Sequence, residues 1–395
     1  MFTRMLRILI PLSAALLSAC ATRQQQPNRV PIADEPALAG HLLLIGGGLE
    51  TDNTAVFDRF FGLVRQFAGR DKPRVVIATA ATLEQQQSAE RNRRTLALHC
   101  PDCEISVVTR ETPTMETVAL VNAAHGLFFT GGDQKRITAR YLNAEQDTPE
   151  SSAMRRLLWR GGVIAGTSAG DAMMSDPMFL TGRSAAALGV ITESSDSNNL
   201  GAAEPGGEDD RPDGLRDVKL GPQIGKGMGF LPWAITDSHF FERHRFGRLV
   251  AALEQSGQRF GIGVSENACV EVDLATGAVM GVGTSESLLV DVRELRRDGL
   301  ARLGVRTRVI SNGTTISLIR DGTPEIGAKP QRPARINDIP TGSTPEERRR
   351  SAALFFLAAV GGDARVAARL RLDGYELIGW PDGLGGAIID ILPLK

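Results

Sequence analysis

The chain has 395 residues, of which 42% are hydrophobic and 23% are charged, and its formal net charge is −1. This composition is typical of a soluble globular protein with enough apolar residues for one large core or two modest ones. The balanced charge gives no indication of a nucleic-acid partner. Because the chain has only five His and four Cys, candidates for metal ligands and catalytic groups are few.

Residues 1–19 have the features of a secretory signal peptide. Two arginines precede an apolar stretch that is too short for a usual transmembrane helix, and small residues follow it. Residues 17–20, Leu-Ser-Ala-Cys, resemble a bacterial lipobox, in which Cys20 is lipidated and becomes the mature N-terminus. We therefore expect an exported protein, lipid-anchored in the envelope, with Ala21 favouring the outer membrane. The alternative is a secreted protein that loses Cys20 on cleavage.

A polar tether rich in Gln and Pro is expected over residues 20–39.

The other cysteines allow two interpretations in an exported protein. Further on, Cys100 and Cys103 form either a short disulfide or two free thiols at a strand edge. Cys269 lies in an apolar run and is expected in the core. The five His show no ligand spacing, and no second Cys pair completes a zinc site, so we expect no metal and no cofactor.

Between residues 40 and 170, short apolar segments alternate with helical patterns. Strand-like segments begin at residues 41, 73, 104, 126 and 162, and helical patterns cover 56–69, 84–100, 114–125 and 150–161. This alternation predicts an α/β fold, a mostly parallel sheet with helices on both faces. Reaction sites in such sheets lie at the carboxyl ends of the strands. Three glycine-rich turns fall there, at 46–48, 131–132 and 166–170.

The rest of the chain is less regular. Residues 194–222 are polar, acidic and rich in Gly and Pro, which predicts an exposed insertion in a domain that spans 40–300. A strand, a turn and a helix are expected over 227–253, followed by further strands. Beyond this domain, β-like segments, a Pro-rich stretch and one helical segment predict a smaller β-rich C-terminal extension of unknown role, residues 301–395.

Ser168 lies between two glycines directly after an apolar strand-like run. Gly166-Thr167-Ser168-Ala169-Gly170 matches the spacing of a nucleophile elbow, a tight turn that exposes a serine hydroxyl between strand and helix. The amide of Ala169 would then face the oxygen of an attacked carbonyl. The alternatives are a plain turn and a helix start that binds an anion through its free amides.

His239 follows another strand-like run and is the candidate base for this serine. The alternative is a structural histidine with ordinary hydrogen bonds. Arg243, Arg245 and Arg248 follow it, and guanidinium groups beside a strand end suggest a pocket for carboxylates. The alternative is an ordinary basic helix face. If a helix begins by Phe240, Arg243 and His239 share one face of it.

Four segments resemble, in the same order, the signature segments of cyanophycinases: FFTGGDQ, GTSAGDAMMSDPM, DSHFFERHRFGRL and GIGVSENACV. Cyanophycinases are serine exopeptidases related to the α-aspartyl dipeptidases, with a flavodoxin-like fold similar to class I glutamine amidotransferases. The resemblance covers about residues 40–290. It implies a flavodoxin-like fold and hydrolysis of cyanophycin to β-Asp-Arg dipeptides through an acyl-enzyme.

The resemblance also implies roles for individual residues. Ser168 would be the nucleophile, His239 the general base and Glu266 the carboxylate that orients this base. Gly132 and Ala169 would form the oxyanion hole. The resemblance further implies substrate contacts for Gln134, Asp237, Arg243, Arg245 and Arg248.

Several positions depart from the family pattern. Asp171 stands where the family usually has Ala, and Ser265 replaces an Asp. Asp176 and Glu193 are rival candidates for the third carboxylate. Two further functions therefore stay open: a peptidase of the same fold that acts on other aspartyl or isoaspartyl peptides, and a non-catalytic envelope binding lipoprotein. The expected partner is a peptide or cyanophycin, with the membrane contacted only through the lipid, and a homodimer is left open.

Overall fold

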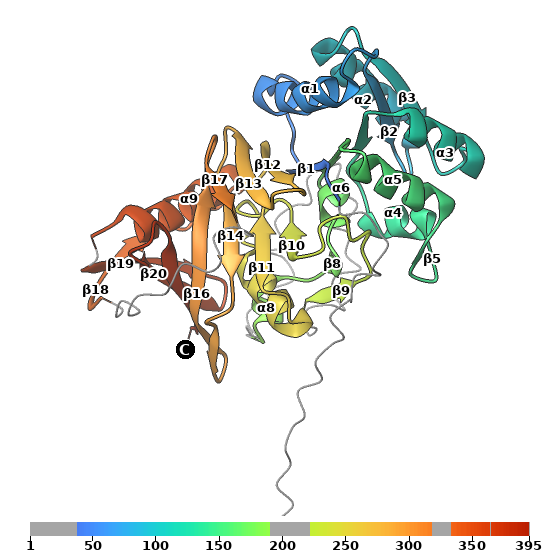
Figure 1. The fold of residues 1–395 in the computed structure, drawn as a ribbon. Helices are drawn as coiled ribbons and strands as arrows, with labels where there is room; N and C mark the ends of the chain where they lie inside the picture. The colour runs from blue at the N-terminus through green and yellow to red at the C-terminus, as the bar shows by residue number, and fades with distance from the viewer. Residues whose placement is uncertain (1–37, 190–221, 318–332, 364, 395) are drawn as a thin grey trace, which may run out of the picture. The chain divides into compact units, whose positions relative to one another are not determined.

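The computed structural model describes residues 38–189, 222–317, 333–363 and 365–394 (Figure 1). Four predicted features therefore lie wholly or almost wholly outside the described residues: the signal peptide, Cys20 with its tether, Glu193, and the acidic insertion at 194–222. Among the helices of the described ranges, none combines the length and the apolar character needed to cross a bilayer.

The first of the two large sheets has eight strands and includes the parallel strands of the N-terminal part of the chain (Figure 1). Its strand order is β17-β13-β12-β1-β7-β4-β2-β3. Strands β1, β7, β4, β2 and β3 pair in parallel, whereas β12, β13 and β17 continue the sheet in antiparallel fashion. The α/β fold class with a mostly parallel sheet is confirmed. The bounds are β1 His41–Ile45, β2 Arg74–Ala78, β3 Glu104–Val108, β4 Gly126–Phe129, β7 Val163–Thr167, β12 Ala268–Asp273, β13 Ala278–Gly283 and β17 Thr315–Ser317.

Helices cover both faces of this sheet because its central strands carry apolar side chains on both faces. In β1, Leu43 and Ile45 pack against α1 and α2, whereas Leu42 and Leu44 pack toward α3, α4 and α5. Successive side chains of a strand point to opposite faces, so a continuous apolar run requires a helix layer on each side. The bounds are α1 Thr54–Ala68, α2 Gln85–His99, α3 Thr114–Ala123, α4 Gln134–Tyr141, α5 Pro149–Trp159 and α6 Ala169–Ala172.

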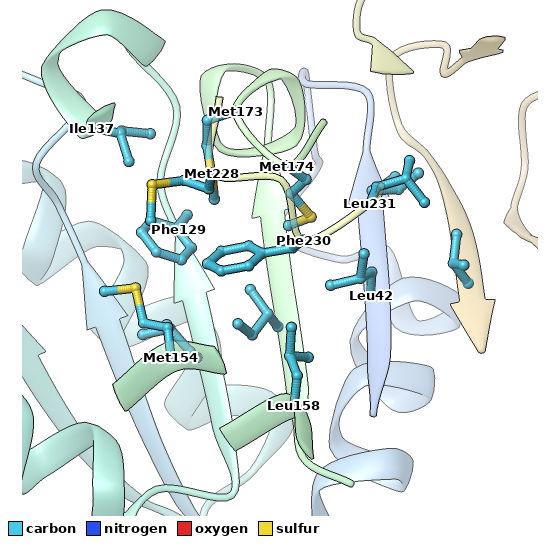
Figure 2. Packing of buried hydrophobic residues seen from close by; sticks show 14 of the residues in the cluster. Leu42, Phe129, Ile137, Met154, Leu158, Met173, Met174, Met228, Phe230 and Leu231 are labelled. Carbon is cyan, nitrogen blue, oxygen red and sulfur yellow. The ribbon is translucent and has the colours of Figure 1, made fainter. Parts of the chain in front are cut away.

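A layer of methionine and phenylalanine side chains packs under the turn that follows β7. Figure 2 shows Met173, Met174 and Met228 beside Phe129 and Phe230, and all five side chains are buried. Unbranched Met side chains fill irregular space well, and each such side chain contributes about 1.5–3 kcal/mol when it is fully buried. This packing supports α6 and the residue that precedes it, Ser168.

A second sheet of nine strands contains the C-terminal part of the chain. Its order is β10-β11-β14-β16-β21-β20-β19-β18, and β15 pairs with β16. Helices α8 and α9 pack on it through a shared apolar cluster. The bounds are β10 Ala234–Asp237, β11 Phe260–Gly263, β14 Ser287–Asp291, β15 Arg296–Asp298, β16 Ala301–Ile310, β18 Arg335–Ile339, β19 Val366–Leu372, β20 Tyr375–Pro381, β21 Ala387–Pro393, α8 Phe246–Ser256 and α9 Pro345–Gly361.

This second sheet crosses the predicted boundary at residue 300. Strand β16 begins at Ala301 and pairs with β14 on one side and β21 on the other. The C-terminal region is β-rich as expected, but its strands continue a sheet that begins with β10. Short elements complete the fold: β5 Leu142–Asn143, β6 Gln146–Asp147, β8 Met178–Thr181, α7 Ser184–Ala187 and β9 Gln223–Gly225.

The start of helix α8 differs from the sequence expectation, and the state of the cysteines, left open there, is defined by the structure. Helix α8 begins at Phe246 and not at Phe240, because the preceding turn includes His239 and His244 at φ values of 46° and 49°, which no α-helix accommodates. Cys100 and Cys103, left open above, are joined by a disulfide with a Cα–Cα distance of 5.3 Å. Cys269 is buried, as expected.

Candidate active site

Ser168 lies at the carboxyl edge of the first sheet, directly after β7. Its backbone has φ 55° and ψ −109°, in the left-handed region that a residue other than glycine rarely adopts. Its amide donates a hydrogen bond to the Ile45 carbonyl at the end of the neighbouring β1, at 2.9 Å. The serine thus occupies a tight turn between strand and helix, which is the geometry of a nucleophile elbow.

The two glycines around Ser168 are required by close backbone packing. A Cβ on Gly166 would lie 2.2 Å from the Gly170 carbonyl oxygen, and a Cβ on Gly170 would lie 2.7 Å from the Phe129 carbonyl oxygen. Real Cβ atoms do not approach backbone oxygens this closely. The spacing of the motif therefore has a steric cause in this fold.

His239 reaches the serine from the second sheet, at the end of β10. Its Nε2 lies 2.8 Å from Ser168 Oγ. Its amide donates to the Gly46 carbonyl at 2.7 Å, and its ring fills the space that a side chain at Gly47 would need. The glycine turn after β1 therefore makes room for the imidazole, a role that the sequence pattern alone did not indicate.

Glu266 completes the line of contacts from the turn between β11 and β12. Its Oε1 lies 2.6 Å from His239 Nδ1. The amide of the next residue, Asn267, donates to the Gly47 carbonyl at 2.8 Å. The rival Asp176 binds Lys226 Nζ at 2.5 Å instead, and Glu193 lies outside the described residues. Serine, histidine and glutamate are thus brought together in one continuous chain of contacts.

The electrostatics of this chain favour a neutral imidazole. Burial lowers the pKa of His239 to about 4, and the hydrogen bond to Glu266 only partly opposes this effect. The same hydrogen bond lowers the pKa of Glu266, so this carboxylate stays ionised. The tautomer that fits both contacts carries its proton on Nδ1 and leaves Nε2 free to accept the serine proton. Such an imidazole can act as a general base near neutral pH.

The glycine pair after β4 lies against the serine. A Cβ on Gly131 would lie 4.0 Å from Ser168 Oγ, and one on Gly132, at φ 142°, would meet the Ala81 carbonyl oxygen at 2.5 Å. Ala169 follows the serine as the first residue of α6. Gly131 therefore lies beside the nucleophile at the end of β4, and Ala169 follows it at the end of β7. Gly132, the other residue expected to form an oxyanion hole, follows Gly131 in the same turn.

The three arginines do not form the shared carboxylate pocket that the sequence suggested. Arg248 is buried, and its Nε and Nη2 donate to the two oxygens of Asp237 at 2.8 and 2.5 Å. Arg245 contacts Asp237 at 3.3 Å and the Ser238 carbonyl at 2.6 Å. The carboxylate that these two arginines bind is internal, because Asp237 is itself buried below the site.

Two further predicted residues have distinct surroundings. Gln134 is buried, and its amide nitrogen donates to the Phe179 carbonyl at 2.9 Å, so its contact in this structure is with the protein itself. Arg243 is half-buried, and its positive charge acts on both His239 and Glu266. The charge of Arg245 acts on the same two residues, but Arg245 also binds Asp237, so Arg243 is the candidate of the trio for a substrate contact.

Asp171, a departure from the family pattern, links the two halves of the site. Its Oδ1 accepts a hydrogen bond from Thr236 Oγ1 at 2.6 Å, which connects α6 to β10. Burial raises the pKa of this carboxyl well above its usual value. Asp171 therefore lies behind the nucleophile and joins the helix after Ser168 to the strand before His239.

Comparison with known proteins gives consistent matches. Residues 42–200 match Peptidase family S51. A cyanophycinase of Synechococcus elongatus is 25% identical over 208 residues, which are 52% of this chain and 54% of that protein. A cyanophycinase of Nostoc sp. is 26% identical over 305 residues, covering 76% and 89% of the two chains. The chain thus spans about half the length of the Synechococcus relative.

Solved structures match as well. A peptidase from an acI-B1 Actinobacterium aligns with a TM-score of 0.49 and 18% identity, over 72% of this chain and 99% of that one.

Proposed function

We propose that the chain is a serine exopeptidase of the cyanophycinase type, and the match of residues 42–200 to Peptidase family S51 supports this proposal. The observation that carries the proposal is the chain of contacts from Ser168 through His239 to Glu266, at 2.8 and 2.6 Å. The likeness to cyanophycinases over as much as 76% of this chain supports the same reading.

The proposed mechanism follows from this geometry. His239 Nε2 takes the hydroxyl proton as Ser168 Oγ attacks the peptide carbonyl carbon, and Glu266 stabilises the imidazolium. The amides of Gly132 and Ala169 are the proposed donors to the developing oxyanion. The imidazolium then protonates the leaving amine, and the acyl-enzyme forms. Water, deprotonated by His239, attacks the ester and releases a product with a free carboxylate, while the proton returns to Ser168.

The proposed substrate is cyanophycin, a poly-aspartate main chain with arginine joined to each side-chain carboxyl. Cleavage of the main chain would release β-Asp-Arg dipeptides. Arg243 supports this choice, because it is half-buried and its charge lies beside His239 and Glu266. A guanidinium at this point could hold a carboxylate of the chain end, which would make cleavage start from the end.

We also propose that the protein is exported and anchored in the bacterial envelope, at the outer membrane, through lipid on Cys20. The signal-like residues 1–19 and the disulfide between Cys100 and Cys103 support export, since disulfides persist in oxidising compartments. Replacement by Cys20→Ala should move the protein from the membrane fraction to the soluble one, and an unchanged distribution would refute the anchor. A homodimer stays a prediction that light scattering tests.

The function is tested by mass spectrometry of the products after incubation with cyanophycin. The wild-type protein should release β-Asp-Arg dipeptides, and Ser168→Ala should release none while its melting temperature stays close to that of the wild type. Full activity in Ser168→Ala would overturn the proposal. Cleavage of isoaspartyl peptides but not of cyanophycin would favour the related peptidase of the same fold. This alternative stays open because Arg245 and Arg248 bind Asp237 within the protein and not a substrate. A wild-type protein that no serine-reactive probe labels would favour a binding lipoprotein.

A further inference from the structure

The turn that carries His239 is enclosed by the C-terminal part of the chain. Between β10 and α8, Phe241 stacks on Phe356 of α9, with ring centroids 5.5 Å apart and an interplanar angle of 14°. Arg348 of α9 donates from Nε to the Glu242 carbonyl at 2.7 Å. The Tyr375 hydroxyl of β20 lies 3.4 Å from the His244 carbonyl oxygen. Residues that follow position 340 in the sequence thus contact the segment directly after the imidazole.

This segment needs external support because two of its residues are strained. His239 and His244 have φ values of 46° and 49°, and each such conformation costs a non-glycine residue about 1–2 kcal/mol. Conformations of this kind persist only where the surrounding structure holds them in place. The contacts from α9 and β20 provide this support.

Glu242 lies at the centre of this support. Its side chain is almost fully buried, yet neither carboxylate oxygen has a close hydrogen-bond partner among the described residues. The Nε of Arg349 on α9 lies 3.7 Å from its Oε1. Arg349 also donates from Nη1 to Ser285 Oγ at 3.0 Å, which fixes the guanidinium beside Glu242.

We propose that Glu242 and Arg349 are positioning residues for the His239–Glu266 pair, so that helix α9 supports the active site directly. This inference rests on the proposed function. Glu242 lies three residues after His239, and its carboxylate lies near that of Glu266. The ion pair between Glu242 and Arg349 of α9 holds the turn that carries His239. It also balances the negative charge of Glu242, which would otherwise lie uncompensated near Glu266.

The ionisation of Glu242 gives the arrangement a distinct pH signature. Burial raises the pKa of Glu242 to about 7, and the negative charge of Glu266 adds to this effect. The backbone amides of Glu242 and Glu266 and the charge of Arg349 oppose it. Glu266 and Arg349 are the charged groups that face the carboxylate, one on the β11–β12 turn and one on α9. As the pH falls through 7, Glu242 takes up a proton and its attraction to Arg349 weakens. Reactivity of Ser168 should therefore decrease in a step near pH 7, well above the pKa of His239, which is about 4.

The experiment measures the rate at which a fluorophosphonate probe labels Ser168, together with kcat and KM for cyanophycin, across pH 3–9. Arg349→Met should slow labelling and lower kcat about 10- to 100-fold at constant KM, since small displacements of a catalytic group have effects of this size. Arg349→Lys should recover most of the rate. The matched control is Arg350→Met, because exposed Arg350 pairs with Glu346 on the same helix and lies away from the turn.

Glu242→Gln supplies the second readout with nearly unchanged shape. Its rate profile should lack the step near pH 7 and keep the decrease near pH 4. Equal rates in Arg349→Met and Arg350→Met, or a step near pH 7 that persists in Glu242→Gln, would overturn the positioning role. If Arg349→Met does not fold, Glu242→Gln decides alone. A wild-type protein that the probe does not label would instead refute the proposed function, so the two failures are distinguishable.

Discussion

Gly47→Ala should separate the imidazole from the nucleophile although neither His239 nor Ser168 is itself replaced. A Cβ at position 47 would lie 2.3 Å from His239 Cε1 and 2.4 Å from Nε2. Carbon atoms in contact are normally about 3.5–4.0 Å apart, so the ring must move by about 1 Å or more. A displacement of that size can lengthen the present 2.8 Å contact to Ser168 Oγ beyond hydrogen-bond range.

The expected effect is large on catalysis and modest on folding. A misplacement of about 1 Å in a reacting group costs about 100-fold in rate, so kcat should fall by at least that factor. Alanine at a φ of +94° also costs the fold about 1–2 kcal/mol. Gly69→Ala is the matched control, because Gly69 has a φ of +61° and an added Cβ would meet no atom within 4 Å.

The two variants should therefore differ in activity but not in stability. Initial rates of dipeptide release and the rate of probe labelling at Ser168 measure the first quantity, and urea unfolding measures the second. Gly47→Ala with a kcat within threefold of Gly69→Ala would refute the reasoning, since it would mean that the imidazole tolerates the displacement or is not the base.

Four further predictions concern the charges of the site. Glu266→Gln keeps the shape of the side chain but favours the wrong imidazole tautomer, so kcat should fall by about 10³–10⁴-fold, and a loss below tenfold in initial-rate measurements would contradict its role. Because burial lowers the pKa of His239 to about 4, kcat/KM should decrease as the pH falls through 4, when the base takes up a proton, and a profile still level at pH 3 would contradict this. Arg248→Met removes a buried partner of Asp237 and should lower the free energy of unfolding by about 3 kcal/mol in urea titrations. Arg243→Gln should instead raise KM with little change in stability, and equal stability losses in the two arginine variants would argue against their separate roles.

The parallel part of the fold was predictable because its signals are local. Strand-like segments expected to begin at residues 41, 73, 104, 126 and 162 are observed to begin at 41, 74, 104, 126 and 163. Each is a short apolar run that ends in glycine or a polar turn, and such punctuation depends on the nearest few residues only. The proximity of the turns at these strand ends then follows from the parallel arrangement.

The arginine cluster could not be interpreted from sequence in the same way. A basic segment looks alike whether its guanidinium groups face a substrate or an internal carboxylate. Which of the two applies depends on the path of the chain between Asp237 and Arg248. In this segment two residues adopt left-handed conformations, and α8 therefore begins only at Phe246. This delay brings Arg248 Nε to 2.8 Å from Asp237 Oδ2. No periodic pattern reports a turn of this kind.

The glycine turn after β1 explains how Ser168, from the first sheet, and His239, from the second, come within hydrogen-bond distance of each other. Three consecutive carbonyls of this strand end accept the amides of three separate segments: Ile45 accepts from Ser168 at 2.9 Å, Gly46 from His239 at 2.7 Å, and Gly47 from Asn267, beside Glu266, at 2.8 Å. Ser168 and His239 are 71 residues apart in sequence, yet one short stretch of backbone fixes both. Because neighbouring carbonyls cannot move independently, a change in this turn should disturb the whole site together, whereas a change in one side chain should not.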